Sequence, residues 1–454
     1  MKKMIVTLIL HSFFFGQSYT QTISPARPLD HLRVSKDRRS LVHENGSPFF
    51  WLADTGWELF HRLDKQDVDF YFKKRAEQGF TVIQAVALAE MDGLHTPNAY
   101  GELPLENDDP SKPRKAYFQY VEWIIDKAAY YGLYIALLPT WADKVFKDRW
   151  GKGPEIFNSA TAKAYGQWIG NRFKDKSNII WILGGDRNPR NESDVEIWRA
   201  MAAGVAEGVH NPDNTLMTYH PQPSETSSSS PWFHKDDWLD FNMLQTGHCR
   251  DTKVWEKISR DYNLQPTKPT LNGESIYEDH PVCFKPKELG YSNAYDIRKA
   301  AYLSVFAGSA GYTYGCHAVW QFYSHEREGV NGPLKTWKIS LDLPAASQVK
   351  YLKRLISTIP ESCRPAQQIL LDTLDGTQRI QALQANGHVL VYSAAGEPFR
   401  LNNKVVNLKN FGHGYWYDPR TGKQQLLSKQ AIQTDASFVP PAKGDGNDWV
   451  LVLF

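Results

Sequence analysis

Three consecutive stretches decide the fold: TVIQAV, residues 81–86, then YFQYVEWIIDKAAYYG, residues 117–132, then LYIALL, residues 133–138. The first and last are short apolar runs rich in branched residues, which predicts buried strands. The middle stretch repeats its apolar residues at helical spacing and closes on Gly132, a typical end of a helix. The order strand, helix, strand predicts a parallel pair joined by a crossover helix.

The same alternation continues over residues 45–350. Helical stretches separate most of the eight apolar runs, which are residues 49–53, 81–86, 133–138, 178–183, 215–219, 239–244, 269–272 and 311–314. Eight such units fit a closed (β/α)8 barrel. An open doubly wound sheet is the alternative, but no glycine-rich nucleotide loop follows any of the strands.

Beyond residue 365 the pattern changes to short strands separated by turn residues. Expected strands lie at 369–371, 379–383, 388–392, 404–408, 414–417 and 449–453, with hairpin signals at Asp375-Gly376, Asn386-Gly387 and Thr421-Gly422. We therefore predict an α/β chain in three parts: a signal peptide at 1–20, a catalytic barrel with an N-terminal hairpin at 21–350, and a small antiparallel β-sandwich packed on the barrel at 351–454.

Composition narrows the function. The chain has 454 residues with 52 Lys and Arg against 50 Asp and Glu, and loss of Lys2 and Lys3 with the signal peptide leaves 50 against 50. This balance argues against nucleic acid as a partner. A basic start and a short apolar run predict export to the periplasm or medium, and we expect no membrane span. The four cysteines form no CxxC pair; one disulfide is possible, but free buried thiols are expected.

Two carboxylates stand at strand ends where barrel enzymes place their chemistry. Asp186 follows the fourth strand and Glu274 the seventh, so they face each other across the mouth of an eight-stranded ring. Each follows a glycine, which we read as room for a ligand. A facing pair is what glycoside hydrolysis needs: about 5 Å apart for retention, about 6.5 Å or more for inversion. A lone acid would more often cap a helix or pair with an arginine, and we expect the adjacent Arg187 to point away.

Other residues at the ends of strands suit a sugar. Aromatic rings and histidines stack on sugars or bond their hydroxyls, and the expected substrate-binding residues are Asp54, Trp57, Trp141, Tyr219, His220, His248, Tyr314, His317 and Trp320. The histidines with Asp54 also admit a metal-dependent hydrolase. No close His-x-His pair occurs, so we expect no metal and no cofactor.

Four motifs resemble the apiosidase-like glycoside hydrolases, family one hundred and forty. They are WLADTGW at 51–57, NAYG at 98–101, WILGGDRNP at 181–189 and NGE at 272–274. GYWYDPRTG at 414–422 resembles the small sandwich that follows that barrel. The resemblance covers nearly the whole mature chain. Related retaining barrels carry Asn-Glu-Pro after the fourth strand, where this chain has the shorter Asp186.

The resemblance implies an endo-apiosidase of a Gram-negative bacterium that cleaves the apiose–galacturonic acid bond in pectic rhamnogalacturonan II. It makes Asp186 the acid/base and Glu274 the nucleophile. The expected partner is a plant cell-wall polysaccharide or oligosaccharide, and a monomer is expected. Two alternatives stay open: a glycosidase of this architecture acting on an arabinofuranoside or glucan, and a non-catalytic carbohydrate-binding protein.

Overall fold

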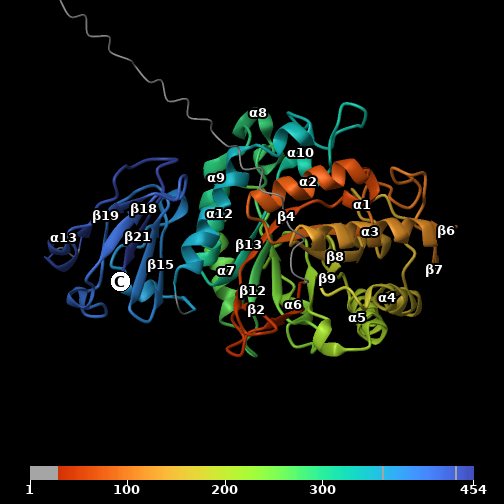
Figure 1. The fold of residues 1–454 in the computed structure, drawn as a ribbon, viewed down its shortest axis with the longest axis horizontal. Helices are drawn as coiled ribbons and strands as arrows, with labels where there is room; N and C mark the ends of the chain where they lie inside the picture. The colour runs from red at the N-terminus through yellow and green to blue at the C-terminus, as the bar shows by residue number, and fades with distance from the viewer. Residues whose placement is uncertain (1–28, 360–361, 435–436) are drawn as a thin grey trace, which may run out of the picture.

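The computed structural model describes residues 29–359, 362–434 and 437–454, and the expected signal peptide lies outside them. Eight parallel strands form one sheet in the order β10-β9-β8-β5-β4-β13-β12-β11 (Figure 1). Their bounds are β4 (Trp51–Thr55), β5 (Val82–Leu88), β8 (Tyr134–Thr140), β9 (Ile179–Gly184), β10 (Met217–His220), β11 (Asn242–Gln245), β12 (Thr270–Glu274) and β13 (Ser309–Tyr314). The (β/α)8 prediction is confirmed.

A helix follows each strand and covers the outside of the sheet. The eight are α2 (Lys65–Glu77), α3 (Lys115–Tyr130), α4 (Ser159–Phe173), α5 (Glu192–Val209), α6 (Ser230–Phe233), α7 (Val254–Tyr262), α9 (Ala294–Phe306) and α12 (Pro344–Ser357). Side-chain caps fix several helix starts: Asn158 accepts from the Thr161 N–H, and Asn293 from the N–H groups of Tyr295 and Asp296. None of the helices in the described residues is long and apolar enough to cross a membrane.

The two edge strands of the sheet, β10 and β11, meet without a regular ladder, and we call this line of contact the seam. Asp240 closes it: its backbone N–H donates to the Met217 carbonyl at 2.9 Å, and its carboxylate accepts the Met217 N–H at 2.7 Å. The Thr218 hydroxyl adds a bond to the Phe241 carbonyl at 2.6 Å. The barrel is therefore closed on this side by side chains and single bonds.

A three-stranded sheet covers the end of the barrel where the strands begin. It contains β1 (Leu32–Val34), β2 (Leu41–His43) and β3 (Pro48–Phe49). The antiparallel pair of β1 and β2 is the predicted hairpin. Leu32, Leu41 and Phe49 share one buried cluster with apolar side chains inside the barrel. This end is therefore plugged, and the opposite end remains for chemistry.

The C-terminal part is antiparallel. A six-stranded sheet runs in the order β14-β15-β16-β21-β18-β19, and a two-stranded sheet joins β17 (Phe399–Arg400) to β20 (Ser437–Phe438). The large sheet contains β14 (Arg364–Pro365), β15 (Ile380–Ala385), β16 (His388–Ser393), β18 (Gly414–Tyr417), β19 (Gln424–Leu426) and β21 (Trp449–Leu453). Two predicted strands are wrong. In place of the strand at 369–371, a 3-10 turn ends at Ile369 and Leu370 makes only an isolated bridge to Leu401; residues 404–408 are irregular. Ile369, Val406 and Leu408 are nevertheless buried in the core of this domain.

This domain packs against α9 and α12 (Figure 1). Arg298 on α9 is buried and pairs with the buried Asp448, with 2.7 Å between Nη2 and Oδ1. Tyr302 stacks on Tyr392 with ring centroids 4.9 Å apart. A buried ion pair and a shared apolar cluster make the two parts one packed body.

Replacing Arg298 by alanine should lower the free energy of unfolding by about 3 kcal/mol, because it strands the buried Asp448 carboxylate. Arg400→Ala is the matched control: its pair with Asp372 is exposed, so its loss should change stability by less than about 1 kcal/mol. Urea unfolding followed by circular dichroism measures both.

Removal of the C-terminal domain tests the same interface. If a chain ending at residue 362 were as soluble, active and heat-stable as the whole, the C-terminal domain would be a detachable module and the interface would have no stabilising role.

Candidate active site

Asp186 leaves the end of β9 on an unusual backbone. Gly184, Gly185 and Asp186 all have positive φ, at 83°, 123° and 54°. A non-glycine residue in this region is uncommon and is held by its surroundings. Here the Gly185 N–H donates to the His220 carbonyl at 3.0 Å, and the Asp186 N–H points to Nδ1 of the His220 ring at 3.4 Å. The turn and β10 therefore fix each other.

The glycines before the two carboxylates do not make room for a ligand, as the sequence suggested. A side chain at Gly185 would come within 2.6 Å of the Trp141 ring, and one at Gly273 within 2.5 Å of Met243. Protein side chains occupy both spaces. The glycines instead allow Trp141 and Met243 to pack directly against the backbone that carries Asp186 and Glu274.

Glu274 at the end of β12 lies between two histidines. Its Oε2 is 3.0 Å from Nε2 of His220, and its Oε1 is 3.4 Å from Nε2 of His248. The side chain is only 5% exposed. Burial works to raise the pKa of this carboxyl, but the two close imidazoles outweigh burial and hold the pKa well below its usual range. Glu274 is therefore an ionised carboxylate at neutral pH.

Asp186 has the opposite balance. Burial and the charge of Glu274 raise the pKa of Asp186 to about 6, against the opposing effects of Arg187, His220 and the Trp150 hydrogen bond. The two acids are thus close enough to influence each other's ionisation. One keeps a proton far more readily than the other, which is the division between acid and nucleophile.

Arg187 does not point away from Asp186, and this expectation is wrong. Its Nη1 donates to the Asp186 carbonyl at 2.7 Å and lies 3.6 Å from Oδ2 of the same residue. Its Nη2 donates to the Lys147 carbonyl at 2.8 Å. Because the guanidinium is shared with two backbone carbonyls, it lowers the pKa of Asp186 without overcoming burial and Glu274.

The remaining predicted residues divide into two sets. Trp57 and Trp141 contact the His220 ring, with centroids 5.3 and 5.8 Å away, and lie at the base of the site. Trp320 donates from its indole to Nδ1 of His317 at 3.4 Å, on the same side of the mouth as His248. Ring contacts through His220 and His248 connect these side chains to Glu274.

Asp54, Tyr219 and Tyr314 do not belong to this group, although we expected them to bind substrate. All three are fully buried and point outward, between strands and helices. Asp54 pairs with Arg75 of α2 at 2.6 Å, the Tyr219 hydroxyl donates to the Arg187 carbonyl at 2.8 Å, and the Tyr314 hydroxyl donates to Glu278 at 2.7 Å. They hold strand ends and loops in place.

Three histidines pack in a row, one pair stacked and the other edge to face, instead of pointing their nitrogens at one place. His248, the unpredicted His280 and His317 form a row with centroid separations of 4.3 and 4.5 Å. Burial, with His248 and His317 nearby, lowers the pKa of His280 to about 2, so this ring is neutral. Among the described residues the ligand atoms that converge belong to Cys249, Asp251 and Cys283, and the two sulfurs are bonded to each other.

Two known domain families match this chain. Residues 35–361 match the family model described as the apiosidase-like catalytic domain. The chain belongs to the apiosidase-like family. Residues 364–454 match a second model, described as the collagen-binding domain of a collagenase. A search of curated proteins found no match.

Solved structures that resemble this chain are glycoside hydrolases. A glycoside hydrolase family 5 protein from Bacteroides vulgatus is 31% identical, with a TM-score of 0.83 over 93% of this chain and 92% of that one. Another structure, named only as a glycoside hydrolase, is also 31% identical, with a TM-score of 0.83 over 93% and 96% of the two chains. The protein is a glycoside hydrolase with an apiosidase-like catalytic domain.

Sequence reasoning missed several residues of this apiosidase-like site. Glu90 follows β5 and is partly buried; burial and the charges of Asp186, Glu58 and Asp143 raise its pKa well above its usual range. Tyr277 packs against His248, with centroids 4.6 Å apart. Glu90 could have been found as an acid at the end of the second strand. Tyr277 lies three residues past a strand end and carried no such signal.

The cysteine expectation is corrected for two of the four. Cys249 and Cys283 form a disulfide that joins the loops after β11 and β12, whereas Cys316 and Cys363 are free. The Cys283 N–H also donates to the His248 carbonyl at 2.9 Å. The disulfide therefore anchors the loop that presents His248 to Glu274.

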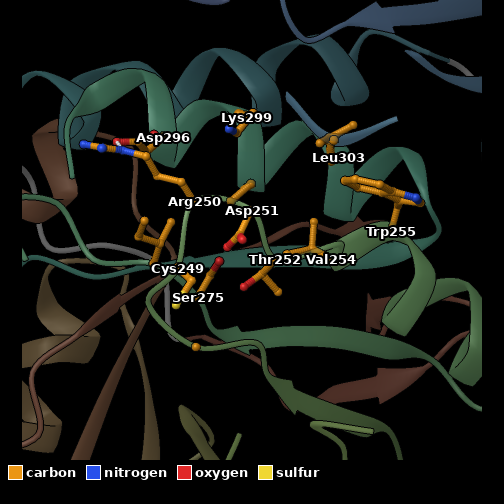
Figure 2. A pocket seen from close by; sticks show the side chains of 14 residues that line it. Cys249, Arg250, Asp251, Thr252, Val254, Trp255, Ser275, Asp296, Lys299 and Leu303 are labelled. Atoms are coloured by element: carbon orange, nitrogen blue, oxygen red, sulfur yellow. Dashed lines mark hydrogen bonds and ion pairs between the residues drawn. The ribbon is translucent and has the colours of Figure 1, made fainter. Parts of the chain in front are cut away.

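A small hollow lies on the flank of the barrel beside this disulfide. Figure 2 shows Arg250, Asp251, Trp255 and Lys299 around it, and neither Asp186 nor Glu274 is among its lining residues. Arg250 is already bonded to Asp296 at 2.9 Å and to the Tyr291 carbonyl at 2.6 Å. The hollow is separate from the chemistry at the mouth.

Replacing His248 by alanine should move the acidic limb of the pH–rate profile to higher pH. A nucleophilic role for Glu274 would require it to be ionised, and His248 helps to keep its pKa low, so the pKa rises when this partner is lost. His95→Ala is the control, because His95 is exposed and bonds Asp92 and Asp108 instead. The kcat/KM profile from pH 3 to 9 measures the shift; an unmoved acidic limb would contradict the role given to His248.

Proposed function

We propose that this glycosidase is an endo-apiosidase of glycoside hydrolase family 140, acting on the apiose–galacturonic acid linkage of pectic rhamnogalacturonan II. Two observations support this. The catalytic domain belongs to the apiosidase-like family. The site also pairs an ionised Glu274 with a proton-holding Asp186, which carries the mechanism.

The two environments suit a double displacement. Glu274 attacks the anomeric carbon while Asp186 gives its proton to the departing oxygen, whose bond to that carbon breaks. The glycosyl–enzyme bond removes the charge of Glu274, and with it one cause of the raised Asp186 pKa. Asp186 is then a carboxylate that can take a proton from water, which displaces Glu274. Its pKa falls at the step that needs a base.

Charge beside the site supports an anionic leaving group. Arg149 and Lys152 lie in the loop between β8 and α4, the loop that also carries Trp150 beside Asp186. Both are exposed, and neither side chain forms an ion pair with another residue of the described chain. A galacturonic acid residue carries a carboxylate at neutral pH, so these cations in the loop beside the proton donor would favour it over a neutral sugar, while Asp148 in the same loop opposes them.

We also propose that the protein is exported and acts as a monomer on plant cell-wall material. The Cys249–Cys283 disulfide supports export, because such bonds persist in oxidising compartments such as the periplasm.

Glu274→Gln and Asp186→Asn should each fold normally and lose nearly all activity, by about a thousandfold or more, because each removes one half of the acid–nucleophile pair. Glu256→Gln is the control, since Glu256 is exposed on α7. The assay is release of apiose-terminated oligosaccharides from purified rhamnogalacturonan II, alongside arabinofuranosides and glucans. Activity only on an arabinofuranoside or a glucan would contradict the proposed apiosidase specificity. Binding of the polysaccharide without turnover by wild type would favour the non-catalytic alternative.

Dialysis against a chelator should leave activity unchanged, because the mechanism uses only side chains of the chain itself. The measurement is turnover before and after dialysis, with added zinc or calcium as the comparison. Loss on dialysis with recovery by either metal would favour the metal-hydrolase reading of His220, His248 and His317.

A further inference from the structure

Trp150 is a large exposed aromatic residue in direct contact with the proton donor. Its indole Nε1–H donates to Oδ2 of Asp186 at 2.9 Å, and 44% of the residue is exposed. The double displacement described above assigns it no task. A tryptophan ring offers a flat apolar face with a polar edge, which suits a sugar ring, so an exposed indole beside the proposed catalytic carboxyl is a candidate binding surface.

One face of the indole is already covered. The Arg187 guanidinium carbon lies 4.7 Å from the Trp150 ring centroid, and Arg187 is fully buried. Arg187 is fixed in turn by the carbonyls of Asp186 and Lys147. The exposed area therefore belongs to the opposite face and the outer edge of the ring.

The loop that carries the ring is held in one conformation. Buried Asp143 accepts the N–H groups of Lys152 and Gly153, each at 3.0 Å. Gly151 has no room for a side chain, since a Cβ there would come within 2.2 Å of the Lys147 carbonyl oxygen. Trp150 is thus positioned before any substrate arrives, which lowers the entropic cost of binding to it.

The position beside Asp186 decides which part of the substrate meets the ring. In the proposed mechanism Asp186 protonates the oxygen of the leaving group, whereas the sugar that is attacked must reach Glu274, which lies against His220 and His248. Trp150 contacts Asp186 and Arg187 and makes none of the ring contacts that surround Glu274. We propose that the exposed face of Trp150 is the leaving-group subsite, on which the released sugar ring stacks, while its N–H orients Asp186. This inference rests on the proposed glycosidase mechanism.

The hydrogen bond gives Trp150 a second effect. It engages Oδ2, which leaves Oδ1 to present the proton to the glycosidic oxygen. Once that proton has gone, the indole N–H stabilises the carboxylate that remains, so the same bond favours the charge that develops during the reaction. Trp150 is a positioning residue for Asp186 and a binding residue for the leaving group.

Two variants and two substrates separate these roles. Trp150→Ala should lower kcat/KM on the oligosaccharide substrate roughly tenfold or more, through loss of stacking. On the glycosyl fluoride of the same sugar the change should stay within about twofold, because fluoride needs no proton and occupies no ring site. Trp150→Phe keeps a ring but lacks the N–H, so it should lose less oligosaccharide activity than Trp150→Ala. Trp123→Phe, on the outer face of α3, is the control.

The hydrogen bond has its own readouts. Trp150→Phe should move the alkaline limb of the kcat/KM profile to higher pH, because loss of the N–H raises the pKa of the acid that must stay protonated. In protein labelled with nitrogen-15 at tryptophan, the Trp150 indole resonance should titrate near pH 6, and Asp186→Asn should abolish that titration. The resonance reports on the bond without any substrate.

The outcomes are distinct. Wild-type protein that hydrolyses neither substrate contradicts the proposed function, while the indole titration still tests the bond to Asp186. Equal losses on oligosaccharide and fluoride in Trp150→Ala would overturn the subsite. An indole resonance that does not titrate, or an alkaline limb that does not move, would overturn the positioning role.

Discussion

The site depends on keeping one carboxylate charged where water is almost excluded. Glu274 meets that constraint through two histidine nitrogens, at 3.0 and 3.4 Å. His220 carries more than this contact. Its Nδ1 faces the Asp186 N–H, so in the neutral ring the proton lies on Nε2 and faces Glu274. One imidazole therefore acts on the ionisation of the proposed nucleophile and on the backbone position of the proposed acid.

Close packing around the strand ends turns that pair of contacts into a fixed geometry. Trp141 fills the space beside Gly185, and Met243 fills the space beside Gly273. The indole and thioether leave the two backbones little freedom to shift. The carboxyl groups are thus placed by apolar contacts behind them and tuned by polar contacts in front.

Sequence periodicity was enough to predict the barrel, its strand order in the chain and the two acids at strands four and seven. It could not settle which way a side chain at a strand end points, because successive residues alternate sides and the last residues bend into loops. Asp54 and Tyr314 were misplaced for this reason: both point outward, to Arg75 and Glu278. Trp150 lay beyond sequence reasoning because a loop brings it to Asp186, 36 residues away.

Because of the seam between β10 and β11, the His220–Glu274 contact also bears on how the barrel is closed. His220 ends one edge strand, and Glu274 lies on β12, beyond the other edge. Their attraction therefore spans the side of the barrel that no backbone ladder closes. A carboxyl with a depressed pKa adds stability above its unfolded pKa and loses it as the pH falls through the folded value. Protonation of Glu274 in acid would thus weaken the closure of the barrel and, in the same step, remove the charge of the proposed nucleophile.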